Sequence, residues 1–166
     1  MTFFRIKKIK GKEYAYVVEN EWHKKGSRQK VKGYLGRAYR FDLKNNADFS
    51  GYFKIEDVPN YVESNNKSKI INDLVEWELF KFSISKEEFS IDLSNIKIQK
   101  NKRHVALLIN DGFMCNLTLK NLLEFKPEGD EQADGYRLAK AFVEAGIEVP
   151  QEVFVGLFSK LYKMTG

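Results

Sequence analysis

The side chains best suited to chemistry in this chain are three carboxylates. Asp92 lies in an expected strand, Asp111 at an expected hairpin turn, and Glu124 shortly after that hairpin. Three carboxylates gathered on a sheet could hold Mg²⁺ as in a nuclease. Each carboxylate also has a role without metal, on a solvent-facing strand, in a turn or on a helix surface. The residues leave both interpretations open and favour the second.

The softer ligands give no stronger signal. His23, His104 and Cys115 fit neither the Cys-x-x-Cys nor the His-x-x-x-His spacing of structural zinc sites. In the expected hairpin about 13 Å of strand separate His104 from Cys115, too far for a nucleophile and its base. Cys115 is therefore expected to be a small buried hydrophobic residue. We expect a protein that is not an enzyme and holds no metal or cofactor.

Positive charge is concentrated at the start of the chain. Residues 1–44 contain 13 Lys and Arg against 4 Asp and Glu, a net charge of +9. Residues 45–166 contain 15 against 19, a net charge of −4. Solubility does not require this asymmetry, whereas attraction to a polyanion does. The first 44 residues are thus the expected binding region.

Residues 3–9, 14–19 and 28–34 have the pattern of three antiparallel strands. Gly11-Lys12 suits a type II′ turn, and Lys24-Lys25-Gly26 suits a three-residue loop. The register that follows places Lys7 opposite Tyr16 and Tyr16 opposite Tyr34. It separates the side chains into an apolar face and a basic-aromatic face. The basic-aromatic face consists of Arg5, Lys7, Tyr14, Tyr16, Trp22, Arg28, Lys30, Lys32 and Tyr34.

The basic-aromatic face predicts contact with nucleic acid. Its Lys and Arg side chains would neutralise phosphates or reach base edges, and its Tyr and Trp side chains would stack on bases or pack. Lys24 and Lys25 at the loop tip would contact the phosphate backbone of the nucleic acid. The alternatives are a solvated sheet whose tyrosines pack on lysine stems, an acidic protein partner, and a membrane surface.

The same segment resembles the N-terminal segment of insertion-sequence transposases from archaea and bacteria. The similar runs are RIKKIKGKEYAYVVEN, which begins at Arg5, and RQKVKGYLG, which begins at Arg28. Small archaeal proteins that share this opening are similar as well. The resemblance implies DNA binding by the N-terminal sheet. The transposases continue into a much larger catalytic core with three acidic metal ligands, and no such core is identified in the rest of this chain.

The remainder of the chain predicts a mixture of helices and strands. A connector with a short strand at 52–55 would precede a helix from Ser68, its N-cap, to about Phe80. The later elements are a strand at 89–98, a hairpin of 104–110 and 113–119 around Asp111-Gly112, a short helix at 118–125, a helix at 134–145 that Gly146 ends, and a helix from Pro150 onward.

These patterns predict an α+β protein. It would comprise a three-stranded antiparallel sheet (1–44), a connector (45–66), and an α+β domain (67–166) with a β-hairpin and a C-terminal helical hairpin. One cysteine and the lack of a long apolar run indicate a cytoplasmic protein away from membranes. The expected function is non-catalytic nucleic-acid binding, with duplex DNA favoured over RNA. The alternatives are an RNA- or ribosome-associated factor, and a homodimer formed through the apolar stripe of the last helix, which includes Val153, Leu157 and Leu161.

Overall fold

The computed structural model describes residues 2–165, and within that range it contains seven strands and six helices. The strands are β1 (Thr2–Ile9), β2 (Lys12–His23), β3 (Gly26–Arg40), β4 (Ser90–Asp92), β5 (Lys97–Lys100), β6 (Arg103–Ile109) and β7 (Gly112–Met114). The helices are α1 (Phe49–Phe53), α2 (Val58–Ser64), α3 (Lys67–Lys81), α4 (Asn116–Leu123), α5 (Glu131–Glu144) and α6 (Gln151–Thr165).

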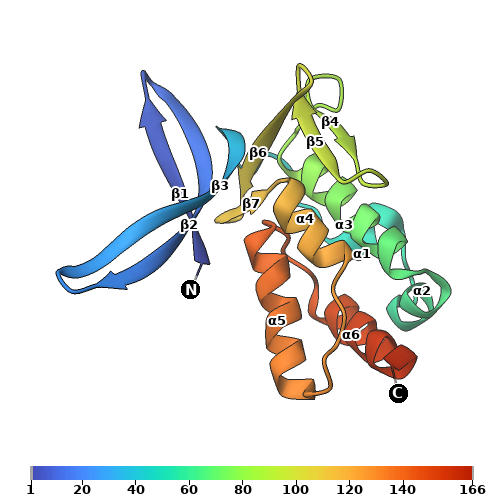
Figure 1. Ribbon diagram of the computed structural model, residues 1–166. Coiled ribbons are helices and arrows are strands. Elements are labelled where there is room, and N and C mark those ends of the chain that lie inside the picture. The colour runs from blue at the N-terminus through green and yellow to red at the C-terminus, as the bar shows by residue number, and fades with distance from the viewer. Residues whose placement is uncertain (1, 166) are drawn as a thin grey trace.

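All seven strands belong to one mixed sheet. Its order is β1-β2-β3-β6-β5-β4, with β7 paired to β6 as well, and the β3–β6 pair is parallel. The mixture of helices and strands is as expected, but the expectation of a separate three-stranded sheet is wrong. The reason lies in the length of β3, because its last residues, Arg37–Arg40, continue and pair with Val105–Leu108 of β6. Figure 1 shows β1, β2 and β3 projecting as two hairpin arms from a helical body.

The β1–β2 turn is of a different type from the one predicted. Lys10 and Gly11 form it with φ angles of +50° and +80°, which is the type I′ pattern rather than type II′ at Gly11-Lys12. As a result Lys7 lies opposite Tyr14 instead of Tyr16. A shift of two residues leaves every side chain on its predicted face.

The β2–β3 pair contains two irregularities that the sequence pattern did not indicate. Tyr16 lies opposite Tyr34 as expected, but the register shifts on both sides of that pair. Lys32 and Leu35 are the extra residues of β3 at these two bulges. Each bulge reverses the alternation of faces along the strand that carries it. Because only the Lys32 bulge lies on the outer side of the Tyr16–Tyr34 pair, the outer part of β3 is turned over relative to the prediction.

The segment at 45–66 is helical where a connector with a short strand was expected. Asp57 accepts a hydrogen bond from the backbone N–H of Asn60 and caps α2, and Pro59 lies in the first turn of that helix. The next helix, α3, is capped by Asn66 rather than by Ser68. The expected strand at 89–98 is divided into β4 and β5, because Asp92 holds a turn between them through Ser94 and Asn95.

The β6–β7 hairpin turns one residue earlier than predicted. Asn110 and Asp111 carry the positive φ angles, +50° and +59°. Gly112 instead lies against the end of α5, where a Cβ would be 2.3 Å from the carbonyl oxygen of Val143. β7 ends at Met114, and Cys115 precedes α4 as a fully buried side chain, as expected.

The two C-terminal helices pack through the apolar stripe of α6. Gly146 ends α5 with φ of +73°, and its N–H donates to the carbonyl of Val143, as predicted for a glycine after the helix. Val153 and Leu157 are buried, so this part of the stripe belongs to the core. Helix α6 packs mainly against α2 and α5. None of the helices in residues 2–165 has the length and apolar character of a membrane span.

Candidate nucleic-acid interface

A cationic groove lies where the N-terminal strands meet the rest of the sheet. It encloses about 800 Å³, and its described lining contains five Lys and Arg side chains and no Asp or Glu. We call it the junction groove. One wall comes from β2 and β3 and the other from the β5–β6 hairpin. The cations are Lys12, Arg37, Lys100, Lys102 and Arg103.

Local backbone geometry brings the two walls together. Gly36 has φ of +114°, and at this residue the backbone of β3 approaches the carbonyl group of His104 on β6. Across the groove, Asn101 and Lys102 have φ angles of +52° and +64° and form the tight β5–β6 turn. This turn leaves the side chains of Lys102 and Arg103 exposed. The groove is therefore formed by a close strand junction and a hairpin tip.

Tyrosine side chains form the aromatic part of this surface. Tyr34 is 56% exposed, and its ring lies 5.2 Å from that of Tyr16 and 6.3 Å from that of Tyr14. The ammonium group of Lys7 lies 4.9 Å from the Tyr16 ring centre. Partial burial, with the neighbouring tyrosines, raises the pKa of the Tyr34 hydroxyl, so this group remains a hydrogen-bond donor at neutral pH. The cluster offers a flat, exposed ring next to cations.

His104 adds an oriented polar group to the lining. Its Nδ1 lies 2.9 Å from the side-chain amide nitrogen of Asn116. The amide oxygen of Asn116 accepts from the backbone N–H of Ile98 at 3.0 Å, so the amide nitrogen must be the atom that faces the imidazole. Assigned from this network, Nδ1 of neutral His104 accepts and Nε2 carries the hydrogen. Nε2–H has no hydrogen-bond acceptor among the described residues and can donate to an anion.

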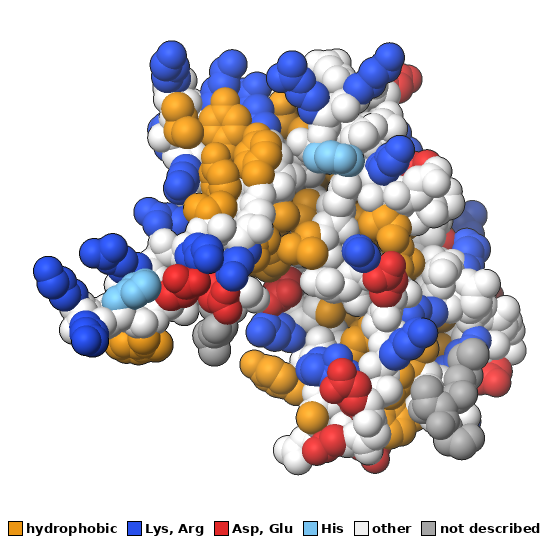
Figure 2. Space-filling view, in the orientation of Figure 1, with side chains coloured by type: hydrophobic (Ala, Val, Ile, Leu, Met, Phe, Trp, Pro, Cys, Tyr) orange, Lys and Arg blue, Asp and Glu red, His pale blue; other side chains and the backbone are white. Residues whose placement is uncertain are grey.

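The glutamates of the N-terminal strands lie on the opposite face of the sheet. The guanidinium of Arg40 binds Glu13 through two hydrogen bonds of 2.7 and 2.8 Å. Lys32 lies 2.9 Å from Glu19, and these contacts lower the pKa of both glutamates. Negative charge is thus neutralised away from the groove, and the groove face stays cationic. Figure 2 shows Lys and Arg side chains, in blue, bordering hydrophobic ones, in orange, over the strands.

The single basic-aromatic face predicted from the sequence is divided between both sides of the sheet. The bulges place Arg28 and Lys30 opposite Glu21 and Glu19, on the face away from the tyrosines. Lys32 contacts Glu19 on that same side. The predicted residues that do share the groove face are Arg5, Lys7, Tyr14, Tyr16, Trp22 and Tyr34, and Lys24 and Lys25 form the tip of the β2–β3 hairpin.

The sequence-based prediction did not include the side of the groove that the β5–β6 hairpin forms. Lys100, Lys102 and Arg103 belong to the run Lys-Asn-Lys-Arg-His, a basic cluster between two strand patterns. The acidic balance of residues 45–166 concealed this cluster, although its local composition is as basic as that of the N-terminal strands. Arg37 was missed because β3 was expected to end at Tyr34.

The three carboxylates considered for a magnesium site have separate structural roles. Asp92 accepts hydrogen bonds from Ser94 and Asn95 in its own turn, which lowers the pKa of its carboxyl to about 2. Asp111 forms the β6–β7 turn, and Glu124 ends α4. Within residues 2–165 no three His, Cys, Asp or Glu side chains are grouped so that they could hold a metal ion. Burial raises the pKa of the Cys115 thiol and makes it a poor nucleophile.

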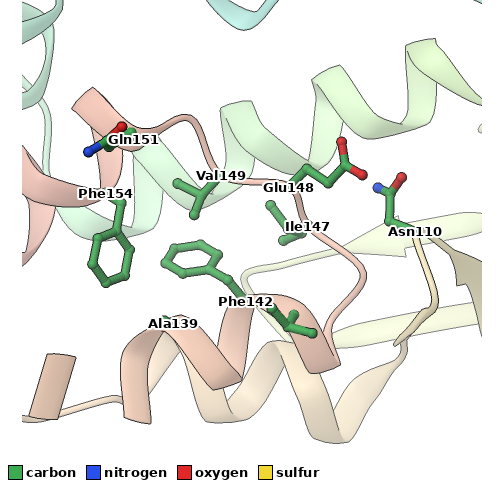
Figure 3. A pocket seen from close by; sticks show the side chains of 9 residues that line it. Asn110, Ala139, Phe142, Ile147, Glu148, Val149, Gln151 and Phe154 are labelled. Carbon is green, nitrogen blue, oxygen red and sulfur yellow. The ribbon is translucent and has the colours of Figure 1, made fainter. Parts of the chain in front are cut away.

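A second cavity, of about 320 Å³, lies between α5 and the start of α6. Figure 3 shows Phe142, Val149 and Phe154 along this cavity, with Asn110 and Glu148 toward one end. The amide of Asn110 already donates to buried Glu78 and to the carbonyl of Gly146, each at 2.9 Å. The Asn110 amide therefore links the β6–β7 turn to α3 and to the end of α5. The rest of the cavity wall is mostly apolar.

Comparison with known proteins adds no relative. The chain matches no protein family, no curated protein and no solved structure.

Proposed function

We propose that this chain is a non-catalytic nucleic-acid-binding protein that prefers duplex DNA to RNA. Its binding surface is the junction groove together with the neighbouring tyrosines. The observation that carries the proposal is a groove lining of five cations without a carboxylate, beside an exposed tyrosine ring. Phosphates attract such a lining, and bases or sugars contact such a ring.

The distribution of glutamates supports a polyanionic ligand over an acidic surface of another protein. Glu13 and Glu19 are held by Arg40 and Lys32 on the far side of the sheet. Among the described residues, the cations of the groove face make no such ion pair, apart from Lys100, which contacts Glu88 at 2.6 Å. A cluster of five positive charges in one groove suits a ligand with regularly repeated negative charge.

The preference for DNA rests on the resemblance of residues 5–36 to transposase N-terminal segments. An RNA- or ribosome-associated role would use the same cations and tyrosines. The choice between them depends on the shape of the nucleic acid, because A-form RNA has a major groove that side chains do not enter.

The test is a competition among labelled duplex DNA, single-stranded DNA and structured RNA between about 50 and 300 mM salt. The proposal predicts tightest binding to duplex DNA and a log-log salt slope of about −0.9 for each phosphate contacted. Tighter binding to structured RNA would favour the RNA- or ribosome-associated role over DNA binding. Failure to bind any of the three at the lowest salt would refute the proposal.

A further inference from the structure

The tip of the β2–β3 hairpin carries an indole side chain that the fold does not use. Trp22 is 84% exposed, and its side chain makes no hydrogen bond, ion pair or ring contact with another described residue. Lys24 and Lys25 form the adjoining turn, and His23 precedes them. Exposed tryptophan is costly in water, and tryptophan is enriched among the residues that contribute most to binding. An exposed indole without contacts in the fold therefore indicates a binding role for Trp22.

Trp22 lies on the face of the sheet that continues into the junction groove. Tyr14 and Tyr16 precede it on β2 at alternating positions, so the three side chains point to one side of the strand. A hydrogen bond from the Arg5 guanidinium to the side chain of Gln29 crosses this same face between groove and tip. The Val18–Val31 pair and this Arg5–Gln29 contact therefore lie between the two regions on the same face.

The tip is too far from the groove for one small ligand to touch both. The strand from Tyr14 to Trp22 advances by eight residues, about 26 Å at roughly 3.3 Å per residue. A duplex rises about 3.4 Å per base pair, so about 8 base pairs span that length. Figure 1 shows the β2–β3 hairpin as an arm that projects away from the body, and Figure 2 shows Lys, His and hydrophobic side chains together at its tip.

We propose that the β2–β3 arm is a second contact site for the nucleic acid held in the junction groove. Trp22 stacks on or inserts beside a base of that ligand, while Lys24 and Lys25 contact its backbone. This inference rests on the proposed function and adds a minimum ligand length. A nucleic acid that bridges both sites gains affinity through the connected second contact, whereas a shorter one gains none.

Fluorescence of the full chain with DNA duplexes of about 6, 10 and 16 base pairs tests this inference. Trp22 is exposed and Trp77 is buried, with its indole N–H donating to the carbonyl of Ala47. Quenching by iodide therefore reports mainly on Trp22. The longer duplexes are expected to protect it from iodide, and the shortest duplex is not. Trp22→Phe serves as the control that leaves Trp77 as the only indole.

The affinity of Trp22→Ala provides an independent measurement. We expect binding of the 16-base-pair duplex to weaken about tenfold or more, as base stacking on an aromatic ring predicts, and binding of the 6-base-pair duplex to stay unchanged. Tight binding of all duplexes with unchanged Trp22 quenching would overturn the inference and leave the proposed function intact. Protection by anionic phospholipid vesicles but not by DNA would also overturn it. If the unaltered chain bound none of the duplexes, that result would instead refute the proposed function.

Discussion

The backbone at Gly36 lies so close to the carbonyl group of His104 that a side chain at position 36 would overlap it. A Cβ at position 36 would be 2.2 Å from the carbonyl oxygen of His104 and 2.7 Å from its carbonyl carbon. The φ angle of +114° at Gly36 also belongs to a region that residues other than glycine rarely adopt. This backbone contact joins β3 to β6 and sets the separation between the tyrosines and the β5–β6 hairpin.

Gly36→Ala is therefore expected to destabilise the protein by at least about 2 kcal/mol, because both the steric overlap and the backbone strain oppose it. Gly33→Ala on the same strand is the matched control, since a Cβ there meets nothing within 4 Å. Urea unfolding of both variants measures the difference. Equal stability of the two variants would contradict the close junction of β3 and β6.

Tyr34 is expected to contribute to binding through its ring. Tyr34→Ala should weaken binding of single-stranded DNA by about 1–3 kcal/mol, the usual contribution of base stacking on an aromatic side chain. Tyr34→Phe keeps the ring and should bind nearly as well as the unaltered chain. Tyr136→Ala, at a 70%-exposed tyrosine on α5 away from the groove lining, is the control. Similar titration curves for the two alanine variants would remove Tyr34 from the site.

Asp134 makes folding stability depend on pH in the acid range. Its buried carboxylate accepts hydrogen bonds from Arg137 at 2.7 Å and from the hydroxyl of Tyr162 at 2.8 Å. These bonds, with two from backbone N–H groups, lower its pKa to about 2. Since an unfolded Asp titrates near about 3.9, the folded state binds fewer protons in this range. The stabilisation is complete above about pH 4 and is lost as pH falls toward about 2.

Asp134→Asn removes this titration. The free energy of unfolding, measured by urea at several pH values, should fall less steeply between about pH 4 and pH 2 in the variant than in the unaltered chain. The variant should also be less stable at neutral pH, because it loses charge-assisted hydrogen bonds. Parallel pH curves would mean that Asp134 titrates alike in the folded and unfolded states.

Local patterns identified most elements but not their exact pairing. The three N-terminal strands, the pair Tyr16–Tyr34 and the glycine that ends α5 all follow from alternation and turn chemistry. The bulges at Lys32 and Leu35 do not, because an extra residue in a strand leaves no mark in a pattern of basic and aromatic residues. The bulge at Lys32 decides on which face the outer lysines and arginines lie relative to Tyr34.

Long-range pairing was the other feature that sequence could not supply. Arg37 of β3 is more than 60 positions away in the chain from Lys102 and Arg103 of the β5–β6 hairpin. These residues line one groove only because β3 pairs in parallel with β6. No local signal specifies that partner. The basic composition of each segment could be recognised alone, but their combination into one surface required the fold.

The proposed function assigns nucleic-acid binding to the groove face rather than to the whole basic segment. The most direct test compares Lys102→Gln/Arg103→Gln in the groove with Lys30→Gln/Lys32→Gln on the opposite face. Both double variants remove two positive charges from exposed side chains. At about 150 mM salt the Debye length is about 8 Å, so distant charges are largely screened and local contacts dominate.

Titration of labelled duplex DNA against both double variants across salt concentrations gives the decisive result. The groove variant should bind at least about tenfold more weakly, with a salt slope about 2 units shallower, and the opposite-face variant should remain close to the unaltered chain. Equal losses in both variants, or a larger loss in the Lys30/Lys32 variant, would contradict the assignment of binding to the junction groove.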